Sequence, residues 1–332
     1  MKKRQPMKIA IVRLSAMGDI IQSMIVLQII KKYSPKSTID WYVEDRFCGL
    51  LKDANGLNNV FSLKIKGVKF LSIPFKIIEL YKSLRSKESY DLVIDLQGLI
   101  KSGLISRMIR AKKRCGFDSN SARESLSAFF YTKSFSVPYN ENVVIRNVML
   151  VERCLNIKIP PERIIFKKSI FKKNTNFNKS NYAVFVIGAS FDSKIYPIEK
   201  FAEIANSIEL DIKVIWHSES EKMMADELKK LSPKVIITKK LNFDDLRDVI
   251  FNAKIVIGGD TGPTHLAWAG NIPSITIFGS TPMERNFLQT EINFGIKSDT
   301  YINPYKINKD DFSIRNIDSS EISALAKKLL KT

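Results

Sequence analysis

Residues 254–270 read Lys-Ile-Val-Ile-Gly-Gly-Asp-Thr-Gly-Pro-Thr-His-Leu-Ala-Trp-Ala-Gly. The apolar, β-branched run at 255–257 predicts a buried strand that ends at the two glycines. A helix is expected to begin at Pro263 or Thr264, because the first turn of a helix tolerates a residue without an N–H group. This strand–turn–helix presents free N–H groups and the positive end of a helix dipole at one point, which is typical of an anion-binding site.

The same alternation of strand and helix runs through the chain twice. A polar, Asn-rich segment at 167–181 separates the two series and is interpreted as a linker. Two successive alternations predict an α/β protein with two Rossmann-like parallel-sheet domains. Their expected bounds are 1–170 and 182–310, followed by a C-terminal helical segment at 311–332.

Composition narrows the class of protein. The chain has 332 residues, of which 45% are hydrophobic and 26% are charged, as in a globular protein. No window approaches the ~18 consecutive apolar residues of a membrane span, and the Lys-rich start lacks the pattern of a signal peptide. Three scattered cysteines and two histidines predict a reducing compartment and no metal site. Neither a G-x-G-x-x-G nor a Walker loop is present, so a dehydrogenase or kinase lacks support.

The formal charge of +19 is unevenly distributed. Residues 1–170 hold 31 Lys or Arg against 14 Asp or Glu, whereas residues 171–332 hold 22 against 20. A general lysine-rich bias would raise both halves alike. The first half is therefore expected to bind an anionic partner. The charge alone does not distinguish nucleic acid, a lipid surface and an acidic substrate.

Two carboxylates follow predicted strands of the first half, at the edge where parallel sheets bind ligands. Asp19 lies at the mouth of the first helix, where it could cap the helix or take a proton from an incoming hydroxyl. Asp95 ends a central strand, with Gln97 and Lys101 after it, and also has a capping and a ligand-facing interpretation. The residues alone leave both alternatives open.

Three loops of the second half contain residues suited to a nucleotide or a diphosphate. Ser190 and Lys194 follow its first strand and offer a hydroxyl and a cation, although many surface loops do the same. Glu221 either accepts ribose hydroxyls or favours the helix dipole from the first turn. The string at 260–265, Asp-Thr-Gly-Pro-Thr-His, is the most specific, because the glycines around it argue against an ordinary core histidine.

Most basic residues of the first half are expected to form a solvated face. Arg123 and Arg146 stand at a loop and a helix start, where an arginine can clamp an anion. The amphipathic segment 69–87 is compatible with a membrane surface and equally with packing on its own sheet.

Five strings occur in order along the chain: Ser15-Ala-Met-Gly-Asp-Ile, Asp95-Leu-Gln-Gly-Leu-Ile-Lys-Ser102, Ser121-Ala-Arg-Glu124, Lys194-x-Tyr-Pro197 and Gly259-Asp-Thr-Gly-Pro-Thr-His265. Together they resemble the lipopolysaccharide heptosyltransferases of glycosyltransferase family 9, over about residues 7–330. Within that family, the second and third strings favour the type I enzyme over type II.

The resemblance implies a GT-B fold, with two Rossmann-like domains, a cleft between them and a last helix that crosses back to the first domain. It implies a metal-independent, inverting transfer of L-glycero-D-manno-heptose from ADP-heptose to a Kdo residue of Kdo2-lipid A in inner-core synthesis. Such an enzyme needs no cofactor. It is expected in the cytoplasm of a Gram-negative bacterium, attached peripherally to the inner face of the inner membrane.

The resemblance also assigns roles by position, with Asp19 as the general base. The implied donor contacts are Ser190, Lys194, Glu221, Leu241, Asp260, Thr261, Gly262 and His265, and the implied acceptor contacts are Lys101, Arg123 and Arg146. The chain departs from the family pattern at three places: Ala189 and Ser190 replace two threonines, Tyr196 replaces tryptophan and Leu241 replaces methionine. The first departure removes one hydroxyl from the donor loop.

Two alternatives remain open from the sequence. One is heptosyltransferase II, or a related member with another acceptor or donor sugar. The other is a non-catalytic protein that binds nucleotide sugars or nucleic acid. Few aromatic residues interleave the basic ones, so nucleic acid is not an expected partner.

Overall fold

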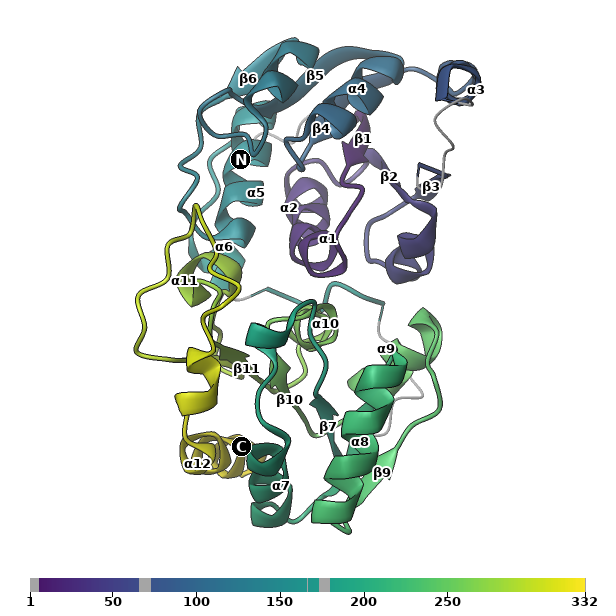
Figure 1. Ribbon diagram of the computed structural model, residues 1–332. Coiled ribbons are helices and arrows are strands. Elements are labelled where there is room, and N and C mark those ends of the chain that lie inside the picture. The colour runs from purple at the N-terminus through teal and green to yellow at the C-terminus, as the bar shows by residue number, and fades with distance from the viewer. Residues whose placement is uncertain (1–5, 66–72, 166, 173–179, 332) are drawn as a thin grey trace. The chain divides into compact units, whose positions relative to one another are not determined.

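The computed structural model describes residues 6–65, 73–165, 167–172 and 180–331. The chain divides into two compact units, 1–172 and 173–332, and the division falls inside the Asn-rich segment that predicted the linker. Each unit is a sheet with helices around it (Figure 1). None of the helices in the described residues has the length and hydropathy needed to cross a bilayer.

The first unit contains a six-stranded sheet in the order β3-β2-β1-β4-β5-β6, with every neighbouring pair parallel. Apolar residues at helical spacing predict one helix over residues 20–33, and the structure divides it in two at Met24. The elements are β1 (Lys8–Val12), α1 (Met17–Ser23), α2 (Ile25–Tyr33), β2 (Thr38–Glu44), η1 (Asp45–Leu51), β3 (Asn59–Leu63), α3 (Ile73–Arg85), β4 (Tyr90–Asp95), α4 (Ile100–Met108), β5 (Ala111–Phe117), η3 (Ser125–Phe130), β6 (Lys133–Phe135), α5 (Val143–Leu155) and α6 (Glu162–Ile165).

The second unit repeats this plan with a parallel sheet in the order β12-β11-β10-β7-β8-β9. Its elements are β7 (Tyr182–Val186), η4 (Asp192–Lys194), α7 (Ile198–Ser207), β8 (Asp211–Ile215), α8 (Glu219–Leu231), β9 (Val235–Ile237), α9 (Phe243–Phe251), β10 (Ile255–Gly259), α10 (Gly262–Gly270), β11 (Ser274–Phe278), α11 (Met283–Asn286), β12 (Asn293–Lys297), η5 (Ser313–Asn316) and α12 (Ser319–Leu330). The prediction of two Rossmann-like parallel sheets is confirmed.

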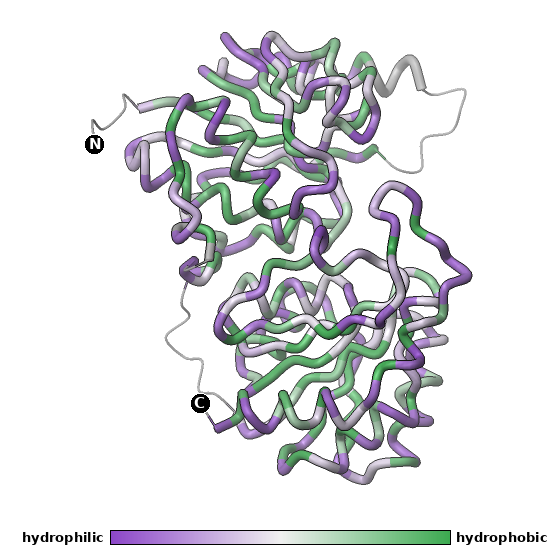
Figure 2. The backbone as a smooth tube through the Cα atoms, turned by 90° about the vertical axis from the view of Figure 1, so that its left-hand side faces the viewer, coloured by the Kyte–Doolittle hydropathy of each residue, from purple (hydrophilic) through white to green (hydrophobic). Residues whose placement is uncertain are grey.

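Hydrophobic runs explain why the strands occupy the middle of each unit. All five residues of β7 and of β10 are buried, as a strand covered by helices on both faces requires. Figure 2 shows mostly hydrophobic segments of backbone running through the second unit. Gly258 lets β10 lie against β7, because a Cβ there would be 2.5 Å from the Val186 carbonyl oxygen.

The C-terminal helix differs from the expectation for 311–332. The resemblance implied that this helix crosses back to the first domain, whereas α12 lies in the core of the second unit. Its Ile322, Ala326 and Leu329 are buried there, and Ser207 of α7 donates a hydrogen bond to Ser323 at 2.9 Å. The apolar face of α12 therefore completes the second sheet's cover.

Both sheets have one topological switch point, where the chain departs in opposite directions from two neighbouring strands. It lies between β1 and β4 in the first unit and between β7 and β10 in the second. Ligands of open α/β sheets bind at the carboxyl ends of such strands. The residues singled out from the sequence follow these four strands and their neighbours.

Candidate functional site

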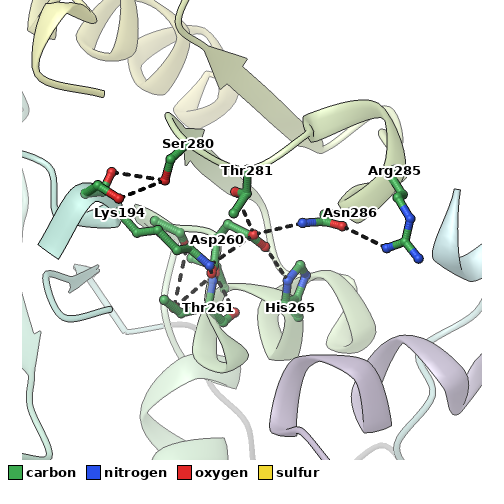
Figure 3. A network of polar contacts seen from close by, with 11 residues as sticks. Lys194, Asp260, Thr261, His265, Ser280, Thr281, Arg285 and Asn286 are labelled. Carbon is green, nitrogen blue, oxygen red and sulfur yellow. Dashed lines mark hydrogen bonds and ion pairs between the residues drawn. The ribbon is translucent and has the colours of Figure 1, made fainter. Parts of the chain in front are cut away.

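A buried carboxylate organises the carboxyl edge of the second sheet (Figure 3). Asp260 follows β10, is 7% exposed and accepts from four side chains of the segments that follow β7, β10 and β11. Its Oδ1 lies 2.9 Å from His265 Nε2, and its Oδ2 accepts from Thr281 Oγ1 at 2.9 Å, Lys194 Nζ at 3.1 Å and Asn286 Nδ2 at 3.2 Å. Lys194 also donates to the Asp260 carbonyl oxygen. We call these five residues the Asp260 cluster.

The charge state of this carboxylate follows from its partners. Burial alone would raise the pKa of Asp260. The Lys194 ammonium, the hydrogen bond and charge of His265 and the Thr281 hydroxyl outweigh burial and hold the pKa well below its usual range. Asp260 is therefore an anion that keeps the Lys194 cation at the switch point.

The first turn of α10 adds backbone donors at the same place. Thr261 is the N-cap, and its N–H donates to Thr264 Oγ1 at 3.2 Å. The Thr264 hydroxyl lies 2.7 Å from the Gly259 carbonyl oxygen, which fixes the turn between strand and helix. The N–H groups of this first turn have no carbonyl partner within the helix, so the turn that contains Gly262 favours an anion.

Glu221 lies in the first turn of α8, the helix that follows β8. Its carboxylate accepts from the His217 N–H at 2.6 Å, while its own N–H donates to the Ser218 hydroxyl at 3.2 Å. Gly188, after β7, makes room for it, since a Cβ there would be 2.3 Å from the Glu221 carboxyl carbon. The remaining predicted donor contacts are less constrained: Ser190 is exposed and Leu241 is half-buried.

The first unit holds Asp19 at its own switch point. Asp19 is in the first turn of α1, its side chain is 40% exposed, and Arg13 Nη2 forms an ion pair with Oδ2 at 2.9 Å. The Arg13 side chain is buried, and its Nη1 donates to the Leu96 carbonyl oxygen at 2.5 Å. Arg13 thus spans β1 and β4 and holds an accessible carboxylate.

Asp95, by contrast, binds the turn after β4 and does not cap α4, whose N-cap is Leu99. It is buried, and its oxygens accept from the N–H of Gln97 at 2.8 Å and the hydroxyl of Tyr131 at 2.8 Å. Burial raises the pKa of Asp95, although these hydrogen bonds oppose the increase. The carboxylate is committed to the turn after β4.

The three predicted acceptor cations have different environments. Lys101 forms an ion pair with Glu44 at 2.6 Å, beside Arg46. Arg123 is exposed, and no hydrogen bond or ion pair joins it to the described part of the chain. Arg146 is buried and donates to the carbonyl oxygens of residues 121, 137 and 138.

Arg146 therefore supports the 121–124 loop from the protein interior, through its hydrogen bond to the Ser121 carbonyl oxygen. Its guanidinium also lies 4.7 Å from the ring centre of Phe117 and 5.2 Å from that of Tyr139. These contacts support the loop that presents Arg123 at the surface.

The sequence did not predict three residues of the candidate site: Thr281, Asn286 and Arg13. The string Gly279-Ser-Thr-Pro282 directly follows β11, and polar residues after a buried strand were the available signal. Arg13 interrupts an apolar strand, which is also a signal for a paired buried cation. Asn286 lies in a short helix, and nothing in the local pattern marks it.

The model of glycosyltransferase family 9 (heptosyltransferase) matches residues 77–302. The chain belongs to this family. Family 9 relatives include lipopolysaccharide heptosyltransferase 1 of Campylobacter coli, 37% identical over 97% of this chain and 99% of the relative. The protein of the same name from Escherichia coli K12 is 28% identical over 83% and 88% of the two chains.

Solved structures place this family 9 chain in the same fold. The E. coli heptosyltransferase WaaC with ADP matches with a TM-score of 0.81 and 23% identity, over 97% of this chain and 100% of that one. The GT-B-like two-domain α/β fold expected from the sequence is confirmed. Among the described residues, no group of three His, Cys, Asp or Glu side chains is arranged to hold a metal ion.

Proposed function

We propose that this chain transfers L-glycero-D-manno-heptose from ADP-heptose to a Kdo residue of Kdo2-lipid A, with inversion at the anomeric carbon. The Asp260 cluster at the β7/β10 switch point is the observation that carries the donor assignment. The names of the relatives from C. coli and E. coli support heptose transfer in lipopolysaccharide synthesis.

The donor is proposed to bind along the carboxyl edge of the second sheet. Its diphosphate approaches the N-terminus of α10 and Lys194, and Glu221 accepts the ribose hydroxyls. His265 and Asp260 act mainly as positioning residues, because their side chains face each other and are buried. Ser190 and Leu241 are proposed to contact the sugar and the adenine.

The chemistry is a single displacement. Asp19 takes the proton of the acceptor hydroxyl as its oxygen attacks the anomeric carbon of heptose. The bond from that carbon to the β-phosphate oxygen breaks on the opposite side, and ADP leaves. Lys194 and the first-turn N–H groups of α10 stabilise the charge that develops on ADP. In this proposal no metal ion or other cofactor takes part.

The acceptor and the location complete the proposal. Arg123 and Lys101 contact the anionic groups of Kdo2-lipid A, and Arg146 holds the loop in place. We propose that the protein attaches peripherally to the cytoplasmic face of the inner membrane, and the strongly positive charge of its first half supports this location.

An acceptor panel tests this function. Purified protein is incubated with ADP-heptose and either Kdo2-lipid A or the same acceptor already carrying one heptose. The products are identified by mass spectrometry. We expect one heptose on Kdo2-lipid A, with or without EDTA. Transfer only to the heptosylated acceptor would assign a type II activity instead, and transfer to neither would contradict the proposal.

A further inference from the structure

An exposed apolar surface of the first unit remains without a role. On α4, the exposed positions Ile100 and Leu104 are 41% and 38% accessible. On η3, Leu126 and Phe129 are 56% and 84% accessible. We call these four side chains the α4–η3 face. Large apolar groups gathered in this way mark an interaction site.

The two elements of this face are held firmly together. Gly103 of α4 meets η3 so closely that a Cβ there would be 2.7 Å from Phe130 Cδ2 and 3.1 Å from the Ser127 carbonyl oxygen. The Glu124 carboxylate accepts from the Ile100 N–H at 2.7 Å. The exposed side chains therefore project from a rigid base.

The segment that contains the α4–η3 face is rich in basic residues. Residues 98–135 contain eight Lys or Arg and two Asp or Glu. Arg107 and Arg110 are exposed at the C-terminal end of α4, and Arg123 is exposed beside η3. A second copy of this chain would bring like charges together at a two-fold contact. Exposed apolar side chains with exposed arginines in the same segment instead fit an anionic lipid surface.

We propose that the α4–η3 face docks this protein on an anionic phospholipid bilayer. Leu126 and Phe129 insert among the lipids, while Arg107 and Arg110 meet the headgroups. The inference rests on the proposed function in one respect, because a lipid acceptor requires the first unit to work at such a surface.

Vesicle binding tests the proposal. Wild-type protein is sedimented with phosphatidylcholine vesicles, with and without phosphatidylglycerol. We expect binding that needs the anionic lipid and weakens with salt. Leu126→Ser with Phe129→Ser should reduce the partition constant about tenfold or more. Arg107→Gln with Arg110→Gln should reduce it about tenfold and flatten the salt dependence.

The second unit offers a matched control. Leu231 and Ile236 are 45% and 46% exposed, so Leu231→Ser with Ile236→Ser removes similar apolar surface elsewhere and should leave binding unchanged. Phe129→Trp provides a readout without loss of apolar area, because its fluorescence should be quenched by brominated lipid. Absence of wild-type binding, absence of quenching, or equal losses in control and face variants would overturn the proposal.

Heptose transfer to a water-soluble, deacylated Kdo acceptor separates this inference from the proposed function. The Leu126/Phe129 variant should retain that activity. Retained transfer without vesicle binding by the wild type would overturn the docking face alone, and vesicle binding without any transfer would overturn the function alone. If the wild type were a dimer that the variant dissociates, the face would be a subunit interface and the proposal would fail.

Discussion

Asp260 is the residue on which the second unit's site depends. Its two oxygens accept from a lysine, a histidine, a hydroxyl and an amide in the segments after β7, β10 and β11. A buried anion with so many donors is stable only while the donors stay in place. The sequence predicted a functional role for Asp260 and His265. It did not predict that residues after β11, Thr281 and Asn286, also bind the Asp260 carboxylate.

Asp260→Asn should strongly destabilise the second unit. The change leaves Lys194 buried without its anion, and losing one partner of a buried pair typically costs about 3–5 kcal/mol. Hydrogen-exchange protection of the β10 amides measures this loss directly. Asp226→Asn, which removes an exposed pair with Lys222, is the control and should cost less than about 0.5 kcal/mol.

The pH dependence of this loss follows from the lowered pKa of Asp260. A carboxyl whose folded pKa lies below its unfolded value of about 3.9 contributes stability above that value and loses it as pH falls through the folded pKa. The gap between wild type and Asp260→Asn should therefore be complete at neutral pH and narrow only in strong acid. A gap that closes near pH 6 would show that another group is responsible.

At the scale of elements, two glycines set how closely parts of the second unit approach. Gly258→Ala places a Cβ 2.5 Å from the Val186 carbonyl oxygen, in a rigid pair of strands. Neither strand can move without breaking the ladder, so the variant should lose about 1–3 kcal/mol or more of stability. Thermal unfolding measures it, and an unchanged melting temperature would contradict the packing described.

Gly188→Ala is the contrasting case. Its Cβ would meet the Glu221 carboxyl group, the end of a flexible side chain, which can move aside. Stability should change little, whereas affinity for ADP should fall about tenfold as a hydrogen bond to a charged group is lost. Calorimetric titration with ADP checks this result. Unchanged ADP affinity would remove Glu221 from the proposed ribose site.

Elements also show what the sequence could and could not predict. The inner strands of both sheets were predicted, because buried parallel strands are nearly continuous apolar runs. The edge strand β12 was not, because its sequence, Asn-Phe-Gly-Ile-Lys, has no such run. The division of the 20–33 helix at Met24 and the packing of α12 in the second unit were not, because local periodicity says which face is apolar but not which partner covers it. The amphipathic segment 69–87 lies partly outside the described residues.

At the scale of the whole molecule, the candidate site was predicted in part. Residues directly after strands were found because parallel sheets gather them at one edge, which is how Asp19, Lys194 and Asp260 emerged. Arg146 shows the limit: its position near a helix start marked it as an anion clamp, whereas its buried guanidinium donates to three backbone carbonyl oxygens. Burial of a long charged side chain depends on contacts far along the chain.

The uneven charge of the two halves agrees with their proposed functions, acceptor binding by the first unit and donor binding by the second. The first half carries nearly all the excess positive charge and the second half the Asp260 cluster. In the proposed mechanism Asp19, in the first unit, takes the proton of the acceptor, and the second unit binds the donor. The central claim is therefore that Asp19 contributes to chemistry and not to donor binding.

Asp19→Asn tests that claim most directly, since it keeps the size of the side chain and removes its basicity. Heptose transfer from ADP-heptose to Kdo2-lipid A should fall by roughly a hundredfold or more in kcat, while the affinity for ADP stays at the wild-type value. A variant that retains most of its kcat, or that loses ADP affinity in proportion to activity, would contradict the account.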